Sequence, residues 1–153
     1  MRITTLAEYG VICALHLARR VADGPVTGRE IAEREQLPAD YVEQILLRLR
    51  RAGIVESVRG AKGGYFLAKP PASISVRDVM AASEHQTFEM NCETHPVDAD
   101  RCAPGSACAI RHVWQALQIR IDTFLGGITI ADLLQEEPAT AELVSLSSSS
   151  ASA

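Results

Sequence analysis

Residues 54–68 read IVESVRGAKGGYFLA, two short apolar runs on either side of a glycine-rich centre. β-Branched and aromatic residues favour extended strands, and glycines favour tight turns, so the pattern predicts strands over 54–58 and 65–68 joined as a hairpin. Two cations, Arg59 and Lys62, lie at the expected tip. A hairpin with a cationic, glycine-rich tip is typical of the wing of a winged-helix domain.

Three helices are predicted before this hairpin. The first covers about residues 4–22, with apolar positions at mostly helical spacing. Thr27, followed three residues later by a glutamate, predicts the N-cap of a second helix that ends near Gln36. The third begins near Pro38, ends at Gly53 and has a buried stripe consisting of Val42, Ile45, Leu46 and Leu49. Two short helices separated by a turn indicate a helix-turn-helix.

Three more helices are predicted after the hairpin. A short one covers residues 75–83, a long amphipathic one covers 108–126, and a last short one, capped by Thr129, ends near Leu134. A long helix outside a small winged-helix core often mediates dimerisation, and a tryptophan is a good anchor. The residues that we expect at a homodimer interface are Ile110, Trp114, Leu117, Ile121 and Phe124.

The predicted fold class is mainly α with a small β-hairpin, a winged helix-turn-helix followed by a long dimerisation helix. The expected divisions are a DNA-binding domain over 1–83 with its wing at 54–69, a cysteine-bearing loop over 84–107, the dimerisation and last helices over 108–136, and a serine-rich tail over 137–153. The composition of the tail predicts disorder.

Length and charge narrow the function further. The 153 residues, 47% of them hydrophobic, suit one domain, and neither a membrane span nor a signal peptide is apparent, so we expect a cytoplasmic protein. The net charge is −4, but six basic residues and one acid between Arg48 and Lys69 give that segment +5 and leave −9 for the rest. Such asymmetry favours oriented docking onto the phosphates of double-stranded DNA.

Candidate DNA contacts follow from the two predicted reading elements. Arg59 beside Gly60 can enter the minor groove, and Lys62 can contact phosphate. On the third helix, Gln44 can pair with adenine and Glu43 can accept a hydrogen bond from cytosine. Further candidates are Asp40 and Tyr41 near the start of that helix, with Arg48, Arg50 and Arg51 as phosphate contacts or part of a solvated face. A winged helix that binds protein instead is the alternative.

Three cysteines, Cys92, Cys102 and Cys108, fall within seventeen residues of a polar, turn-rich stretch. Thiols grouped on a loop indicate a metal, a cluster or redox chemistry, whereas Cys13 on the first helix is expected to be a small buried side chain. Thiolates are suitable ligands for an iron–sulfur cluster. Zinc is a rival, although the gaps do not fit the usual finger spacing, and a cluster-free thiol–disulfide switch is another.

Nothing in the sequence indicates an enzyme. It contains neither a phosphate-binding loop nor a nucleophile paired with a base in a recognisable frame.

Several motifs are similar to those of one known family. They are Tyr41–Ile45, Leu49–Val55, Ser57–Tyr65, Thr123–Leu125 and Ile128–Leu133. Over most of residues 1–136 the chain resembles the IscR/NsrR family of bacterial winged-helix regulators. The resemblance implies a homodimer that reads a pseudo-palindromic operator and carries an iron–sulfur cluster on the three cysteines, whose state sets promoter affinity. It also implies that Glu43 penalises unsuitable DNA sites.

The fourth cluster ligand differs from both branches of that family. IscR-like members place a histidine three residues after the last cysteine, where this chain has Arg111, followed by His112. NsrR-like members take a carboxylate from the first helix of the other subunit, in an Asp-Tyr-Gly context, and this chain has Glu8-Tyr9-Gly10. The resemblance therefore implies Glu8 as fourth ligand, with His112 as the alternative, on a [2Fe-2S] or [4Fe-4S] cluster. The implied function is a transcriptional repressor or dual regulator that senses redox state, nitric oxide or iron–sulfur supply.

Overall fold

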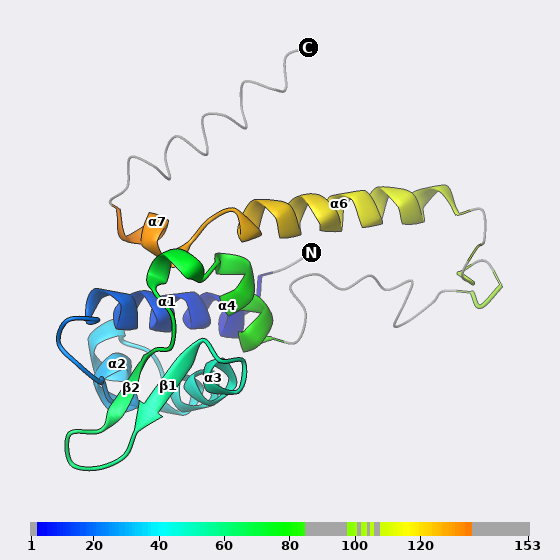
Figure 1. The fold of residues 1–153 in the computed structure, drawn as a ribbon. Helices are drawn as coiled ribbons and strands as arrows, with labels where there is room; N and C mark the ends of the chain where they lie inside the picture. Colours follow the sequence, from blue (N-terminus) through cyan, green and yellow to red (C-terminus); the bar gives the residue numbers. More distant parts are fainter. Residues whose placement is uncertain (1–2, 85–97, 101, 104, 106–107, 136–153) are drawn as a thin grey trace.

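A computed structural model describes residues 3–84, 98–100, 102–103, 105 and 108–135 of the chain. The elements follow one another in the order α1 (Thr5–Arg19), α2 (Gly28–Glu35), α3 (Ala39–Arg51), β1 (Val55–Val58), β2 (Gly64–Leu67), the 3-10 turn η1 (Pro71–Ser73), α4 (Val76–Ser83), α6 (Ala109–Gly126) and α7 (Ile130–Leu134). In Figure 1 the elements from α1 to α4, with α7, form the body, and α6 extends away from it. The predicted fold class, mostly helical with one hairpin, is confirmed.

The helices begin where the sequence places capping side chains. Thr27 accepts a hydrogen bond from the backbone of Glu30 at the start of α2, as predicted, and Ser75 and Thr129 each form a complete capping box at the start of α4 and α7. At the other end of α2, Gln36 adopts the left-handed conformation with φ of 55°. This cap reverses the chain between α2 and α3 and so creates the helix-turn-helix.

The predicted extent of the first helix, 4–22, is wrong at its C-terminal end. Helix α1 stops at Arg19, and the backbone N–H of Asp23 then donates to the carbonyl of Arg20 over 2.9 Å, closing a turn in place of another helical turn. Val21, expected on the apolar face, is consequently 60% exposed.

The core of the body joins elements that are distant in sequence. Helix α3 contributes Val42, Ile45, Leu46 and Leu49, the stripe predicted from its periodicity, and all four are fully buried. Ile130 of α7 is buried in the same cluster, so the chain returns to the body after α6. Burial of such side chains contributes roughly 1.5–3 kcal/mol each.

The hairpin has the antiparallel register Val55↔Leu67 to Val58↔Gly64, within one residue of the predicted strands. Its tip contains Gly60, whose φ of 116° suits glycine. A Cβ on Gly64 would lie 2.6 Å from the carbonyl of Val26. The next residue, Tyr65, forms two backbone hydrogen bonds with Val26, one in each direction. This close approach attaches the hairpin to the segment before α2.

Helix α6 is joined to the described part of the body near its C-terminal end. Leu125 and Ile128 pack against a small cluster with Val76, and the backbone N–H of Val76 donates to the carbonyl of Ile128 over 2.9 Å. Over its full length α6 has no buried residue, and the rest of the helix extends beyond the body in Figure 1. Within the described part of the chain, no helix has the length and apolar character needed to cross a bilayer.

Candidate nucleic-acid interface and cysteine segment

The exposed surface of α3 contains the polar residues that were predicted from the sequence to contact DNA. Asp40, Tyr41, Glu43 and Gln44 are all exposed, while the opposite stripe of the helix is buried in the core. This two-faced arrangement holds the helix firmly by its apolar side and leaves its N-terminal half available to a partner.

Two of these side chains have contacts that orient them. The ring of Tyr41 meets the ring of Tyr9, on α1, edge to face with centroids 6.0 Å apart. The carboxylate of Glu43 lies against Gly28, the first residue of α2: a Cβ on that glycine would be 2.3 Å from Glu43 Oε1. Neither side chain therefore extends simply into solvent.

The arginines at the end of α3 divide into two kinds. Arg48 is half-buried, and its guanidinium Nη1 donates to the backbone carbonyl of Ser83, the last residue of α4. Arg50 is exposed and donates to Ser57 Oγ over 3.1 Å, and Arg51 is also exposed. In this arrangement Arg48 connects α3 to α4, and the two exposed arginines remain the better candidates for phosphate contact.

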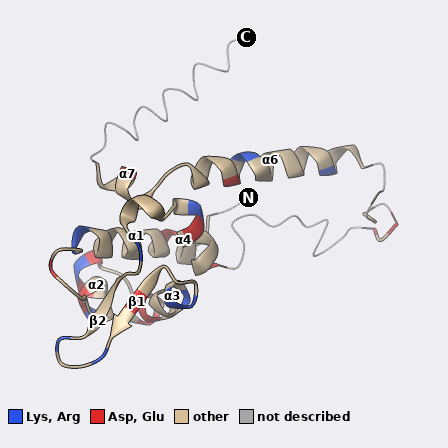
Figure 2. Ribbon diagram, viewed as in Figure 1, with Lys and Arg blue, Asp and Glu red and all other residues tan. Residues whose placement is uncertain are grey.

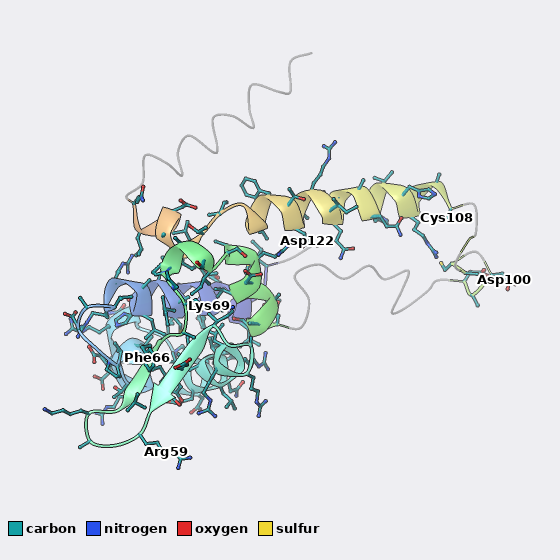
Figure 3. All side chains as sticks on the ribbon, in the orientation of Figure 1. Arg59, Phe66, Lys69, Asp100, Cys108 and Asp122 are labelled. Carbon is teal, nitrogen blue, oxygen red and sulfur yellow. The ribbon has the colours of Figure 1, made fainter. Side chains whose placement is uncertain are left out.

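The wing presents its cations away from the body. Arg59 and Lys62 are both exposed, and Figure 2 shows basic residues on the hairpin loop and on α3. Figure 3 shows the Arg59 side chain extending outward from the loop. The exposed face of α3 and the wing are therefore the two candidate elements for contact with nucleic acid.

The structure describes two of the three loop cysteines, and Arg111 is hydrogen-bonded to the backbone of both. Cys102 and Cys108 are half-buried free thiols. The side chain of Arg111 donates to the carbonyl of Cys102, and its backbone N–H donates to the carbonyl of Cys108 over 3.2 Å. Cys108 is the N-cap of α6 without a side-chain capping bond, so its thiol is not committed to the helix.

The other predicted ligands that the structure describes lie on two different helices. Cys92 lies outside the described residues, and His112 is exposed in the first turn of α6, close in sequence to Cys108. Glu8 is exposed in the first turn of α1, which belongs to the body, whereas Figure 3 places Cys108 at the far end of α6. Among the described residues, no three His, Cys, Asp or Glu side chains are grouped closely enough to hold a metal ion.

The donor chemistry nevertheless fits an iron–sulfur cluster. Cys102 and Cys108 belong to one segment, tied together by Arg111, and thiolates are the usual ligands of iron in such clusters.

Cys13 is separate from this set, as expected. It is fully buried on α1, and burial, assisted by the charge of Glu35, raises the pKa of its thiol to about 12. His16, one turn later, is also buried, and its Nδ1 lies 2.6 Å from Glu35 Oε1 on α2. The contact between His16 and Glu35 joins α1 to α2.

The five residues expected at a homodimer interface lie on α6 with different exposures. Ile110, Trp114 and Phe124 are 46%, 40% and 54% exposed, and Leu117 and Ile121 between them are half-buried. The five residues recur at alternating intervals of four and three, the spacing of a helix–helix seam.

Comparison with known proteins identifies the family. The model of the Rrf2 family, described as iron-dependent transcriptional regulators, matches residues 3–136. The chain belongs to the Rrf2 family. It is 36% identical to the regulator IscR of Yersinia pestis over 137 residues, which are 90% of this chain and 81% of that one.

Solved structures of Rrf2 regulators have the same fold. IscR of T. potens is 34% identical, with a TM-score of 0.69 over 88% of this chain and 87% of that one. CymR of B. subtilis, the global cysteine regulator, is 29% identical, with a TM-score of 0.70 over 87% of this chain and 95% of that one. This Rrf2 protein is thus a DNA-binding transcriptional regulator with a winged-helix fold, and not an enzyme.

Four residues with structural roles in this Rrf2 protein were not identified from the sequence. They are Tyr9, Ser83, Arg111 and Glu35, which contact Tyr41, Arg48, the cysteine segment and His16. Tyr9 and Arg111 belong to the two segments that were compared for the fourth cluster ligand, but no structural role was predicted for either. Ser83 and Glu35 act through partners distant in sequence, and no local pattern indicates them.

Proposed function

We propose that this Rrf2 regulator binds a pseudo-palindromic operator as a homodimer, probing the major groove with α3 and the minor groove with the wing. The observation that carries the proposal is that α3 exposes a row of polar residues while Arg59 points outward from the hairpin loop. A helix with exposed polar residues beside a cationic hairpin suits adjacent grooves of one duplex.

The second copy of the chain is expected along α6. Because α6 has no buried residue over its full length, its apolar seam is available to another subunit. Substitution Trp114→Glu places a charge in that seam and should convert the dimer into monomers in size-exclusion chromatography with light scattering. Ile119→Glu is the matched control: Ile119 is 65% exposed and lies about 140° around the helix at 100° per residue. Equal masses for both variants and the unaltered protein would contradict the interface.

The regulatory part of the proposal is an iron–sulfur cluster held by Cys92, Cys102 and Cys108. Glu8 of the second subunit is the proposed fourth ligand, and His112 is the alternative. When bound, such a cluster supplies iron and sulfide that respond to oxidants, nitric oxide or iron–sulfur supply. The residues of the chain would hold it where two subunits meet, with Arg111 keeping Cys102 beside the start of α6.

In the chain, the cysteine segment is connected to α4 at one end and to α6 at the other. Ser83, the last residue of α4, precedes the cysteine segment in the chain, and its carbonyl accepts a hydrogen bond from Arg48 of α3. At the other end of the segment, the chain rejoins the body after α6: the backbone N–H of Val76 donates to the carbonyl of Ile128, and that of Ile130 donates to the carbonyl of Ile74. A change in the cysteine segment would therefore act on α3 from α4 and on the separation of the two bodies through α6.

The test is purification without oxygen, followed by iron and sulfide counts and visible absorption spectra. The proposal expects iron and sulfide in equal amounts and a coloured protein, and the counts distinguish two-iron from four-iron clusters. Serine at all three loop cysteines should remove both the colour and the response of operator affinity to nitric oxide or oxidant. A colourless anaerobic protein, or one that contains stoichiometric zinc, would refute the cluster.

A second candidate keeps DNA binding and replaces the cluster with a thiol–disulfide switch. It is favoured by the proximity in sequence of Cys102 and Cys108, both bound by Arg111, and by the likeness to S. aureus CymR, solved in an oxidized form, at 30% identity and a TM-score of 0.68. Alkylation mass shifts before and after oxidation of metal-free protein distinguish the two, because only the switch loses two reactive thiols without iron.

A further inference from the structure

The carboxylate of Glu43 occupies space that a side chain at position 28 would fill. A Cβ built on Gly28 would lie 2.3 Å from Glu43 Oε1 and 3.0 Å from its carboxyl carbon. Real Cβ atoms essentially never approach other atoms within 3.0 Å. Glu43 can therefore keep this orientation only because residue 28 is glycine.

The orientation also has an electrostatic reason. Gly28 is the first residue of α2, and the N-terminal end of a helix carries a partial positive charge that attracts a carboxylate. The charged side chains of that first turn are engaged elsewhere: Arg29 donates to Glu33 over 2.8 Å, and Glu30 accepts from Arg20 over 3.1 Å. The carboxylate of Glu43 thus lies against the first residue of α2.

The direction of this carboxylate determines what DNA would meet. A carboxylate directed outward from α3 repels phosphates and the acceptor edges of bases and accepts a hydrogen bond from cytosine N4. A carboxylate held against Gly28 repels these groups less and is less available to cytosine N4. We propose that Gly28 is a specificity-determining residue, which acts through Glu43 by letting its carboxylate lie against α2. This inference rests on the proposed role of α3 in operator binding.

Substitution Gly28→Ala tests the inference directly. Alanine is better than glycine within a helix, and the atoms displaced are the flexible end of Glu43, so the protein should fold with that carboxylate turned outward. The probe is a pool of random-sequence DNA duplexes about three helical turns long, from which each protein selects its preferred sites. Four proteins are compared: unaltered, Gly28→Ala, Glu43→Ala and the double variant.

The expected result is a dependence on Glu43. Gly28→Ala should change base preference, by about fivefold or more, at the positions where Glu43→Ala also changes it. The double variant should select the same sites as Glu43→Ala alone. The inference is overturned if Gly28→Ala selects the sites of the unaltered protein, or if it changes preference equally with Glu43 absent. In the latter case the new Cβ would act through Leu46, whose Cδ1 lies 3.3 Å from it.

Two further measurements keep the outcomes separate. Thermal unfolding should show any loss of stability in Gly28→Ala recovered in the double variant, whereas a loss that persists points to Leu46 and overturns the inference. Arg29→Ala, at the neighbouring position, should leave base preference unchanged, and a shift at the Glu43-dependent positions would refute a steric cause. If the unaltered protein selects no sites, the proposed function itself fails. If the unaltered protein selects sites and Gly28→Ala selects the same ones, the inference about Gly28 fails and the proposed function stands.

Discussion

The ring of Tyr9 meets that of Tyr41 edge-on, with centroids 6.0 Å apart and planes inclined by 84°. This geometry is favourable for two aromatic rings and contributes about 0.5–1.5 kcal/mol beyond burial. The pair joins the first turns of α1, which carry Glu8, to the exposed surface of α3. Glu8, the proposed cluster ligand, is thus the sequence neighbour of Tyr9, whose ring contacts Tyr41, a proposed DNA contact.

Removal of one ring should therefore affect DNA binding. We expect Tyr9→Ala to weaken operator binding by about two- to tenfold, because Tyr41 loses the contact that orients it. Tyr9→Phe retains the ring and is the control. Fluorescence anisotropy with a selected operator measures both variants, and equal affinity of Tyr9→Ala and Tyr9→Phe would contradict the role of the pair.

The contact between Gly10 and Ser83 should be sensitive to a single added carbon. A Cβ on Gly10 would lie 2.0 Å from Ser83 Oγ and 2.9 Å from its Cβ. We expect Gly10→Ala to destabilise the protein by about 1–3 kcal/mol, despite the higher helix propensity of alanine. With Ser83→Gly already present, the same substitution should cost much less in urea denaturation. Additive effects of the two changes would show that α1 and α4 do not meet there.

Arg48 and Arg50 are expected to differ although both are basic residues of α3. Loss of Arg48 deprives the Ser83 carbonyl of a charged donor, so Arg48→Ala should reduce the free energy of unfolding by about 1.5–3 kcal/mol. Arg50→Ala, on the surface, should change it by less than about 0.5 kcal/mol. Urea denaturation of both variants checks this. If Arg48→Ala instead keeps full stability and lowers only the salt dependence of DNA binding, it is a phosphate contact.

The two cations of the wing should act differently on DNA binding. Arg59→Ala should weaken specific binding by about 1–3 kcal/mol if that residue reads the minor groove, whereas Lys62→Ala should weaken all sites alike and lower the salt slope by about one. Lys69→Ala, at the base of the hairpin, removes the same charge away from the tip and is the control. Titrations at several salt concentrations separate these effects, and unchanged operator affinity of Arg59→Ala would refute the wing assignment.

Cys13 should be chemically silent where the loop cysteines react. Burial raises the pKa of its thiol to about 12, so at pH 8 it stays protonated as well as inaccessible. In folded, metal-free protein, iodoacetamide should modify Cys102 and Cys108 and spare Cys13, as read by peptide mass spectrometry. Denatured protein, in which all cysteines react, is the control. Labelling of native Cys13 at the rate of the loop cysteines would contradict its burial.

Much of the fold could be predicted because its signals are local. The strands of the hairpin, the capping residues Thr27, Ser75 and Thr129, and the periodic stripe of α3 each depend on neighbours within a few residues. The end of α1 was the exception. Apolar Val21 continued the helical pattern, but the turn between Arg20 and Asp23 replaced another helical turn.

The candidate site divides along the same line. Residue type and spacing alone were sufficient to select the wing cations, the polar face of α3 and the cysteine group, because each is a property of one short segment. Three-dimensional packing was needed to show that Arg48 points at Ser83, 35 residues away, and that Glu43 lies over Gly28. Such contacts depend on how separate helices approach one another, and a local pattern of residues contains no measure of that approach.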